Sequence, residues 1–183
     1  PRFLKAVEEL EDGLSKAAIK LLLFTGGRRG EILSLQWHQV KQNEKRLFLP
    51  DTKNGKSRSI ILNDKAMVVL KELKKNKDSL KKTADSDYLF PSRDGSRRPY
   101  MLDLRIPFGK VCEAAEIEGM RVHDLRHSFA TLALQGGASL YDVSKLLGHS
   151  DISMTQRYAH MADDSLQKAT DDVAGVIDRA VGG

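Results

Sequence analysis

The dipeptide Asn54-Gly55 constrains the fold of this chain more than any other feature of its sequence. It stands between two short runs with strand character, residues 46–50 and 58–62. Asn-Gly between such runs is a strong hairpin signal, because both residue types accept the positive φ angles that a tight turn requires. The sequence therefore predicts one antiparallel β-hairpin in this region.

Helical patterns dominate the rest of the chain. Residues 15–25 predict a buried helix with Ser15 as its N-cap, and two glycines separate it from a short helix over residues 28–35. Further helices are predicted over residues 64–82, 101–117, 123–135, 139–147, 151–160 and 165–180, with a loop over residues 85–99. The predicted fold class is mainly α with a small antiparallel β-sheet, an α+β arrangement.

Charge is distributed unevenly along the chain. Residues 1–100 carry 22 Lys and Arg against 13 Asp and Glu, a net charge of +9, whereas residues 101–183 carry 8 against 12, a net charge of −4. A basic half favours binding of a polyanion, although a solvated Lys-rich helix would produce the same composition.

Several protein classes are disfavoured. No apolar run approaches the roughly 18 residues of a membrane span, and the first residues lack the features of a signal peptide. The single cysteine, Cys112, excludes an internal disulfide framework and a multi-cysteine zinc site. The protein is therefore expected to be cytoplasmic, without membrane contact. Cys112 lies on a helical stretch and is expected to be buried.

Four segments carry polar groups that a structural role alone does not explain. They are residues 25–31, Lys53 on the hairpin, residues 123–127 and residues 148–158. Arginine forks match phosphate oxygens and neutralise developing charge, a phenol can attack phosphorus, and a lysine can protonate a departing oxygen. Two arginines, a lysine, two histidines and a tyrosine thus form a set suited to phosphoryl transfer without a metal ion.

The order and spacing of these segments resemble a known family. Thr25-Gly26-x-Arg28-x-x-Glu31, His123-x-x-Arg126, and Gly148-His149 with Tyr158 nine residues later look like the signature boxes of the tyrosine recombinases, which include phage integrases, integron integrases and Xer-type resolvases. The agreement extends over roughly residues 1–165. Gly27 stands where many members have a larger apolar residue, so we expect a looser turn there.

The resemblance implies a role for each residue of the set. Arg28 and Arg126 would clamp the non-bridging oxygens of the scissile phosphate, and His123 would assist proton transfer at the nucleophile. Lys53 would be the general acid for the leaving 5′ oxygen. The remaining roles are a hydrogen bond to the phosphate from His149 and a 3′-phosphotyrosyl link formed by Tyr158.

Further residues would support this set. Glu31 would orient His123 or Arg28, and Arg29, Lys56 and Arg58 would contact DNA. No cofactor, metal ion or ATP is implied, because the phosphotyrosyl link conserves the free energy of the phosphodiester.

The resemblance also implies a domain organisation and partners. Residues 1–183 would be the catalytic domain, with a tail helix over residues 163–183. The family's separate N-terminal core-binding domain would be absent, so that the chain is a C-terminal fragment. Its partners would be double-stranded DNA and further copies of itself, as a tetramer on two DNA sites and a monomer when free. A bacterial or phage origin is expected.

Other interpretations of the same residues remain open. A type IB topoisomerase uses similar chemistry, and a non-catalytic DNA-binding domain would share the basic surface. His123 and His127 imitate a zinc peptidase motif, although the shorter Asp124 and an intervening arginine argue against it. The segment 55–57 resembles a phosphate-binding loop but has Pro50 where that motif requires glycine. Four aromatic side chains, assigned to packing or to loops, are Trp37, Tyr88, Tyr100 and Tyr141.

Overall fold

The structure is a computed structural model that describes residues 2–50, 57–77, 86–92, 99–161 and 163–181, with the backbone alone for 160, 161, 163–169 and 172. It divides into two compact units, residues 1–127 and 128–183.

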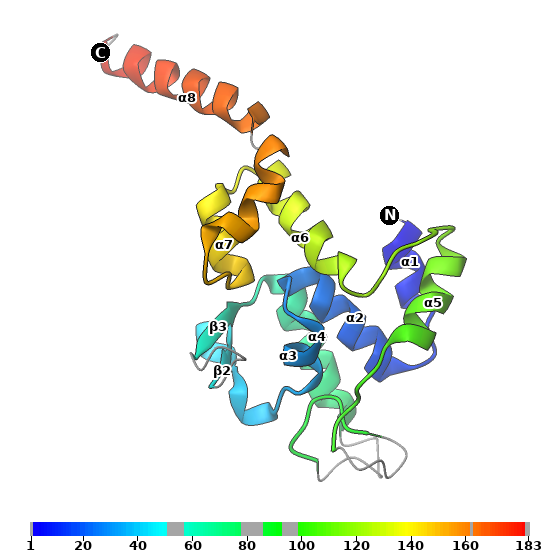
Figure 1. Ribbon diagram of the computed structural model, residues 1–183. Coiled ribbons are helices and arrows are strands. Elements are labelled where there is room, and N and C mark those ends of the chain that lie inside the picture. The colour runs from blue at the N-terminus through cyan, green and yellow to red at the C-terminus, as the bar shows by residue number, and fades with distance from the viewer. Residues whose placement is uncertain (1, 51–56, 78–85, 93–98, 162, 182–183) are drawn as a thin grey trace. The chain divides into compact units, whose positions relative to one another are not determined.

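Helices in two pairs build most of the first unit. Helix α2 (Gly13–Thr25) packs on α4 (Asp64–Lys77), and α1 (Arg2–Glu8) packs on α5 (Arg105–Ala114), as Figure 1 shows. Buried leucine, isoleucine and alanine side chains of α2 lie at the centre of the core. Burying this apolar surface is the main driving force for folding of the unit.

Three of these helices differ from the sequence-based expectation. Helix α2 begins two residues before Ser15, because Asp12 is its N-cap and accepts hydrogen bonds from the Leu14 backbone N–H at 3.1 Å and from the Ser15 hydroxyl at 2.6 Å. Helix α5 begins only at Arg105, and α1 was not predicted because seven residues are too few to show a clear period.

The sheet has three antiparallel strands in the order β1-β2-β3. Strands β2 (Arg46–Leu49) and β3 (Arg58–Ile61) pair with Leu49 opposite Arg58, which confirms the two strands of the hairpin. The Asn54-Gly55 turn itself lies outside the described residues. Strand β1 (Val40–Lys41) has only two residues and was not predicted.

Short elements complete the first unit. Helix α3 (Arg29–Leu33) follows α2, and the 3₁₀ turns η1 (Trp37–Gln39) and η2 (Gln42–Glu44) flank β1. Two residues of the predicted loop form isolated β-bridges, Tyr88 with Gln36 and Pro91 with Tyr100. Cys112 is buried, as expected, and burial raises the pKa of its thiol.

Helix α6 (Asp124–Gln135) begins at the end of the first unit and continues into the second. The second unit adds α7 (Leu140–Leu147), the 3₁₀ helix η3 (Ile152–Met161) and α8 (Asp163–Val181). Its small core consists of Ala130, Leu134, Val143, Leu147 and Tyr158. The helices over 123–135, 139–147 and 165–180 were thus predicted to within two residues at either end, whereas the segment over 151–160 is 3₁₀ rather than α.

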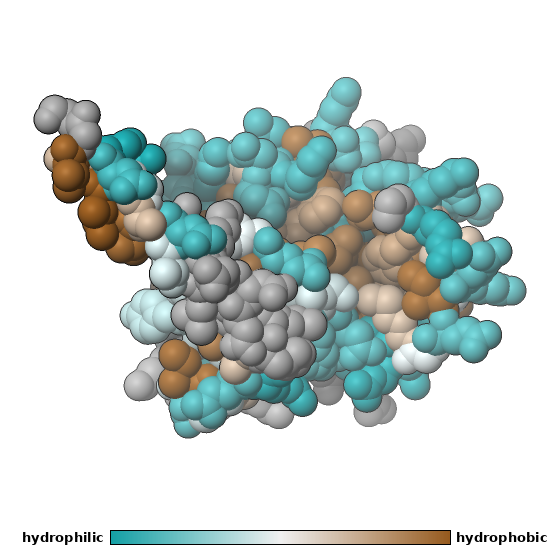
Figure 2. Space-filling model, turned by 90° about the horizontal axis from the view of Figure 1, so that it is seen from above, coloured by the Kyte–Doolittle hydropathy of each residue, from teal (hydrophilic) through white to brown (hydrophobic). Residues whose placement is uncertain are grey.

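Helix α8 exposes its apolar side. Val173, Val176, Ile177 and Val181 are all solvent-exposed, and Figure 2 shows apolar side chains along one side of this helix, next to the C-terminus. Tyr141, expected to pack, is instead exposed on α7, where Lys145 approaches its ring. In the described part of the chain, no helix is both long and apolar enough to cross a membrane.

Candidate active site

The first box of the site is a tight turn at the end of α2. The Thr25 hydroxyl donates to the Leu21 carbonyl at 2.6 Å and accepts the Gly27 backbone N–H at 3.2 Å. Gly26 ends the helix in the left-handed conformation, with φ 62° and ψ 15°, which glycine adopts without a steric penalty. This turn leads the chain directly to Arg28 at the start of α3.

The expectation that Gly27 loosens this turn is wrong. Gly27 is buried, and a Cβ atom added there would lie 2.8 Å from Cδ1 of Ile32 and 3.2 Å from Cδ1 of Ile60. Those two side chains occupy the space beside Gly27, so the turn is closely packed.

Arg28 is held by Glu31, one turn later in α3. The Arg28 backbone N–H donates to Glu31 Oε2 at 3.0 Å, and its guanidinium donates to Oε1 at 2.9 Å. The Arg28 side chain keeps 39% of its surface exposed, whereas that of Glu31 keeps 15%. Glu31 was expected to orient either His123 or Arg28, and the structure shows hydrogen bonds between Glu31 and Arg28.

A second arginine also contacts Glu31. Arg58, the first residue of β3, donates from Nε to Oε1 at 3.1 Å and from NH2 to Oε2 at 2.5 Å. Its side chain is only 13% exposed and that of Glu31 is 15% exposed. Burial raises the pKa of Glu31, but the hydrogen bonds and charge of Arg58, together with the hydrogen bonds from Arg28, outweigh burial and lower the pKa overall. Two of the Arg58 nitrogens thus donate to Glu31. The expected contact between Arg58 and DNA stays a prediction.

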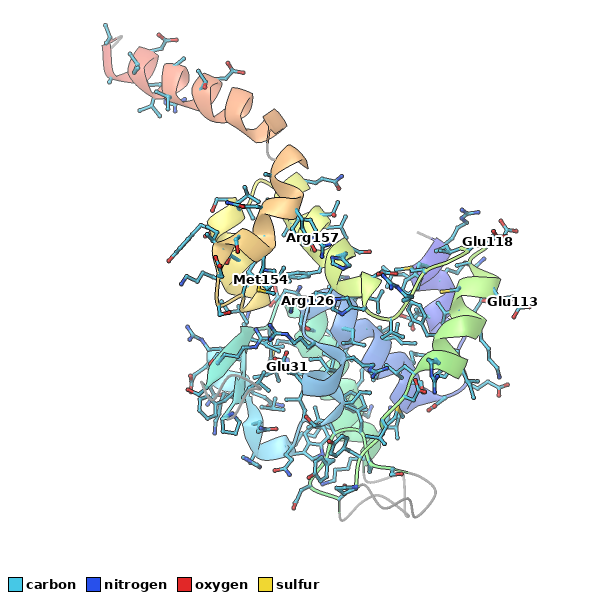
Figure 3. The ribbon with its side chains drawn as sticks, viewed as in Figure 1. Glu31, Glu113, Glu118, Arg126, Met154 and Arg157 are labelled. Atoms are coloured by element: carbon cyan, nitrogen blue, oxygen red, sulfur yellow. The ribbon has the colours of Figure 1, made fainter. Side chains whose placement is uncertain are left out.

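Arg126 reaches the same turn from α6. Its guanidinium donates to the Gly26 carbonyl at 2.7 Å, and only 6% of the residue is exposed. Figure 3 labels Arg126 on α6 and Glu31 on α3. Two boxes that are 100 residues apart in sequence therefore meet at one backbone group. Sequence reasoning proposed both arginines for one phosphate but had no means of showing this contact.

His123 lies in the turn just before α6 rather than inside the helix. Its ring meets that of His127 edge to face, with centroids 5.1 Å apart and planes at 87°. Asp124 accepts hydrogen bonds from the backbone and side chain of Arg121, and these bonds lower its pKa. Among the residues described, no three His, Cys, Asp or Glu side chains converge as a metal-binding group would require.

Of the three remaining basic residues that were expected at the site, the structure describes only Arg29. Arg29 is exposed and lies 4.0 Å from an Asp103 carboxylate oxygen, a distance at the limit of an ion pair. Lys53 and Lys56 lie outside the described residues, so their roles remain predictions.

In the second unit, His149 follows the glycine that ends α7. Gly148 has φ 64° and ψ 47°, and the His149 backbone N–H donates to the Ser144 carbonyl at 3.0 Å. The His149 Nδ1 atom lies 2.8 Å from the Thr155 hydroxyl, and Thr155 is fully buried. Sequence reasoning gave Thr155 no role.

Tyr158 is built into the core of the second unit. It is 7% exposed and packs with Ala130, Leu134, Val143 and Leu147. The neighbouring Arg157 is exposed on η3 (Figure 3). The predicted set is thus divided between the units, with Arg28, His123 and Arg126 in the first and His149 and Tyr158 in the second.

Comparison with known proteins gives this geometry a family context. A sequence model described as "Phage integrase family" matches residues 1–165. The chain belongs to the phage integrase family. This membership confirms the predicted family, and the structure itself confirms the mainly α fold with a small antiparallel sheet.

Individual proteins are similar to the chain in sequence and in structure. The chain is 35% identical to tyrosine recombinase XerD of Rickettsia bellii over 167 residues, covering 84% of the chain and 53% of the relative. A crystal structure of XerA recombinase aligns with TM-score 0.72 at 27% identity, covering 93% of the chain and 60% of XerA. A post-cleavage complex of XerH with its difH substrate shares the fold, with TM-score 0.73, 23% identity and coverage of 92% and 50%. The chain spans about half the length of the curated relatives it matches.

Proposed function

We propose that the chain is the catalytic part of a site-specific DNA recombinase, which cleaves and rejoins DNA strands through a covalent phosphotyrosine. The observation that carries the proposal is the hydrogen bond from Arg126 to the Gly26 carbonyl, two residues before Arg28. It brings two arginine-bearing boxes together in one unit, as a phosphate clamp requires.

The roles within the reaction follow from the chemistry of each group. Arg28 and Arg126 stabilise the charge that builds on the non-bridging oxygens, and Tyr158 attacks phosphorus while its proton passes toward His123. Lys53 protonates the 5′ oxygen as it leaves, so that the broken strand is held on Tyr158 by its 3′ phosphate. Reversal by an incoming 5′ hydroxyl restores the phosphodiester.

His149 binds the phosphate with the help of its neighbour. When the Thr155 hydroxyl donates to Nδ1, the neutral imidazole carries its proton on Nε2 and can donate it to a phosphate oxygen. The same hydroxyl holds the ring orientation before substrate arrives.

The proposed partners are double-stranded DNA and other copies of the chain. XerH is bound to DNA in its structure, and the basic composition of residues 1–100 supports the same partner here. We propose a tetramer on two sites, with the exposed apolar side of α8 packing on a neighbouring protomer, and a monomer in the absence of DNA. Neither a metal ion nor ATP has a role in this scheme, and the cytoplasmic location stays a prediction.

Capture of the covalent adduct tests the proposal. The chain and its Tyr158→Phe variant are incubated with nicked duplexes prepared from genomic DNA of the organism that carries the gene. A nick next to the cleavage site lets the released strand diffuse away and traps the adduct. We expect a protein–DNA band on a denaturing gel for the wild type and none for the variant, at equal DNA binding. An adduct formed by Tyr158→Phe would remove Tyr158 as the nucleophile.

The captured duplex also separates the rival functions. Two copies of it exchange strands if the protein is a recombinase, whereas a type IB topoisomerase relaxes supercoiled plasmid without needing that sequence. A DNA-binding domain without catalytic activity gives a gel shift and no adduct. Peptide hydrolysis that disappears with a chelator and returns with zinc would instead favour the metallopeptidase interpretation.

A further inference from the structure

Glu31 is shared between two arginines that differ in exposure. Each of its oxygens accepts one hydrogen bond from Arg28 and one from Arg58, at distances from 2.5 to 3.1 Å. Arg58 is almost buried, with 13% of its side chain exposed, whereas Arg28 has 39% exposed. The carboxylate thus has a cation on its inner side and another on its outer side.

The three side chains Arg28, Glu31 and Arg58 form a trio in which the positive charges outnumber the negative one. Within the trio, two guanidinium groups face one carboxylate, and Arg28 is the more exposed of the two. Without Arg58, Glu31 and Arg28 would form a neutral pair, and the carboxylate would compete with any phosphate for the Arg28 donors. Charge–charge interactions at these distances are strong where water is largely excluded.

We propose that Arg58 is a positioning residue, whose buried charge balances Glu31 so that Arg28 keeps its positive charge for the phosphate of the substrate. This inference rests on the proposed function and extends it to a residue that sequence reasoning had assigned to DNA contact. Arg58 acts through Glu31.

The bidentate geometry favours this role over a contact with DNA. Both Nε and NH2 of Arg58 are directed at the two oxygens of Glu31, the fork arrangement in which arginine binds a carboxylate most strongly. Lysine can supply the charge at this place but not the two parallel hydrogen bonds. Charge and geometry are therefore separable by substitution.

The decisive experiment measures cleavage of the captured duplex by four variants. Arg58→Met should slow cleavage about tenfold, less than the roughly hundredfold loss expected when a donor that touches the phosphate is removed. Arg58→Lys should retain most of the rate because it keeps the charge. Arg46→Ala, an exposed arginine on the adjacent strand β2, is the matched control and should cleave at the wild-type rate.

The double variant Glu31→Gln with Arg58→Met separates charge balance from a merely structural role. It removes the carboxylate along with its counter-charge, so Arg28 regains its net charge while the amide oxygen of the new glutamine side chain can still accept the Arg28 backbone N–H. We expect this double variant to cleave faster than Arg58→Met alone. Two substitutions in a purely structural contact would instead be as harmful as one, or worse. A double variant slower than Arg58→Met would overturn the proposal.

A neutral substrate provides a second readout. When a methyl group replaces one non-bridging oxygen of the scissile phosphate, less charge has to be neutralised. The defect of Arg58→Met should then shrink, as should that of Arg28→Ala, whereas a folding defect would slow both substrates equally. An equal defect on both substrates would count against the charge role.

A further measurement needs no DNA and covers the case in which Arg58→Met is too unstable to assay. The carboxyl of Glu31 is followed by carbon-13 NMR against pH in the wild-type chain and in Arg58→Lys. Its pKa should lie below the ordinary value in both proteins. An ordinary or raised pKa in the wild type would show that Glu31 is not balanced by Arg58. Failure of the proposed function is distinguishable, because it would appear as the absence of any Tyr158-dependent adduct in the wild type.

Discussion

The two units hold their parts of the site by different means. In the first unit, charged hydrogen bonds join Arg58 to Glu31 and Arg126 to Gly26 across 27 and 100 residues of sequence, and Glu31 in turn holds Arg28. In the second unit, His149 is fixed by Thr155 only six residues away, and Tyr158 by a small apolar cluster. The first part therefore depends on charged hydrogen bonds between residues that are distant in sequence, and the second on a short-range hydrogen bond and apolar packing.

The largest effect is expected from breaking the long-range contact of the first unit. Arg126→Ala should slow cleavage by about 10² to 10³, because it removes a preorganised donor from the site. It should also destabilise the fold by about 1–3 kcal/mol, since a buried hydrogen bond to Gly26 is lost. Single-turnover rates and thermal unfolding measure the two effects. Arg105→Ala, an exposed arginine of α5, is the control, and an active Arg126→Ala would remove Arg126 from the clamp.

The next largest effect is expected from Lys53, because its substitution would remove protonation of the leaving 5′ oxygen. Lys53→Ala should slow cleavage by roughly 10² or more, the usual range for loss of a general acid. A substrate with sulfur in place of the bridging 5′ oxygen needs no proton to leave, so it should rescue Lys53→Ala but not Arg126→Ala. If Lys56→Ala shows the rescue and Lys53→Ala does not, the general acid is Lys56.

A smaller effect is expected in the second unit from Thr155→Val. The substitution keeps the shape of the side chain but removes the hydroxyl that lies 2.8 Å from His149 Nδ1. We expect a loss of roughly fivefold in cleavage rate, which corresponds to one hydrogen bond of about 1 kcal/mol. The NMR spectrum of His149 should show a mixture of tautomers in place of one. Thr131→Val, on α6 of the same unit, is the control, and an unchanged His149 spectrum in Thr155→Val would contradict this role.

The smallest effect on a single protomer is expected from deletion of residues 165–183. The exposed apolar side chains of α8 are covered by no other part of the described chain, so their removal should leave single-site DNA binding nearly unchanged. Cooperative binding to two adjacent sites should weaken, as measured by gel-shift titrations of one-site and two-site duplexes. Val176→Asp is a milder variant with the same expected direction. Unchanged cooperativity would mean that α8 makes no contact with a neighbouring protomer.

Local patterns in the sequence predicted much of the fold. The strands on either side of residues 51–56 and most of the helices of the second unit follow from periodicity, turn residues and capping. Some elements were missed or misassigned because a local pattern needs length to be recognised. Strand β1 and helix α1 are too short to show a period, and the segment around Tyr158 is helical in pattern but 3₁₀ in structure.

The sequence by itself determined the chemical set and the family, because residue types and their spacing carry both. It did not determine which charged groups meet. Arg58 could have faced DNA, yet it faces Glu31, and Gly27 is closely packed rather than loose. These outcomes depend on how α2, α3, α6 and the sheet pack together. Only that packing decides which donor and acceptor, distant in sequence, come within hydrogen-bonding distance once water is excluded.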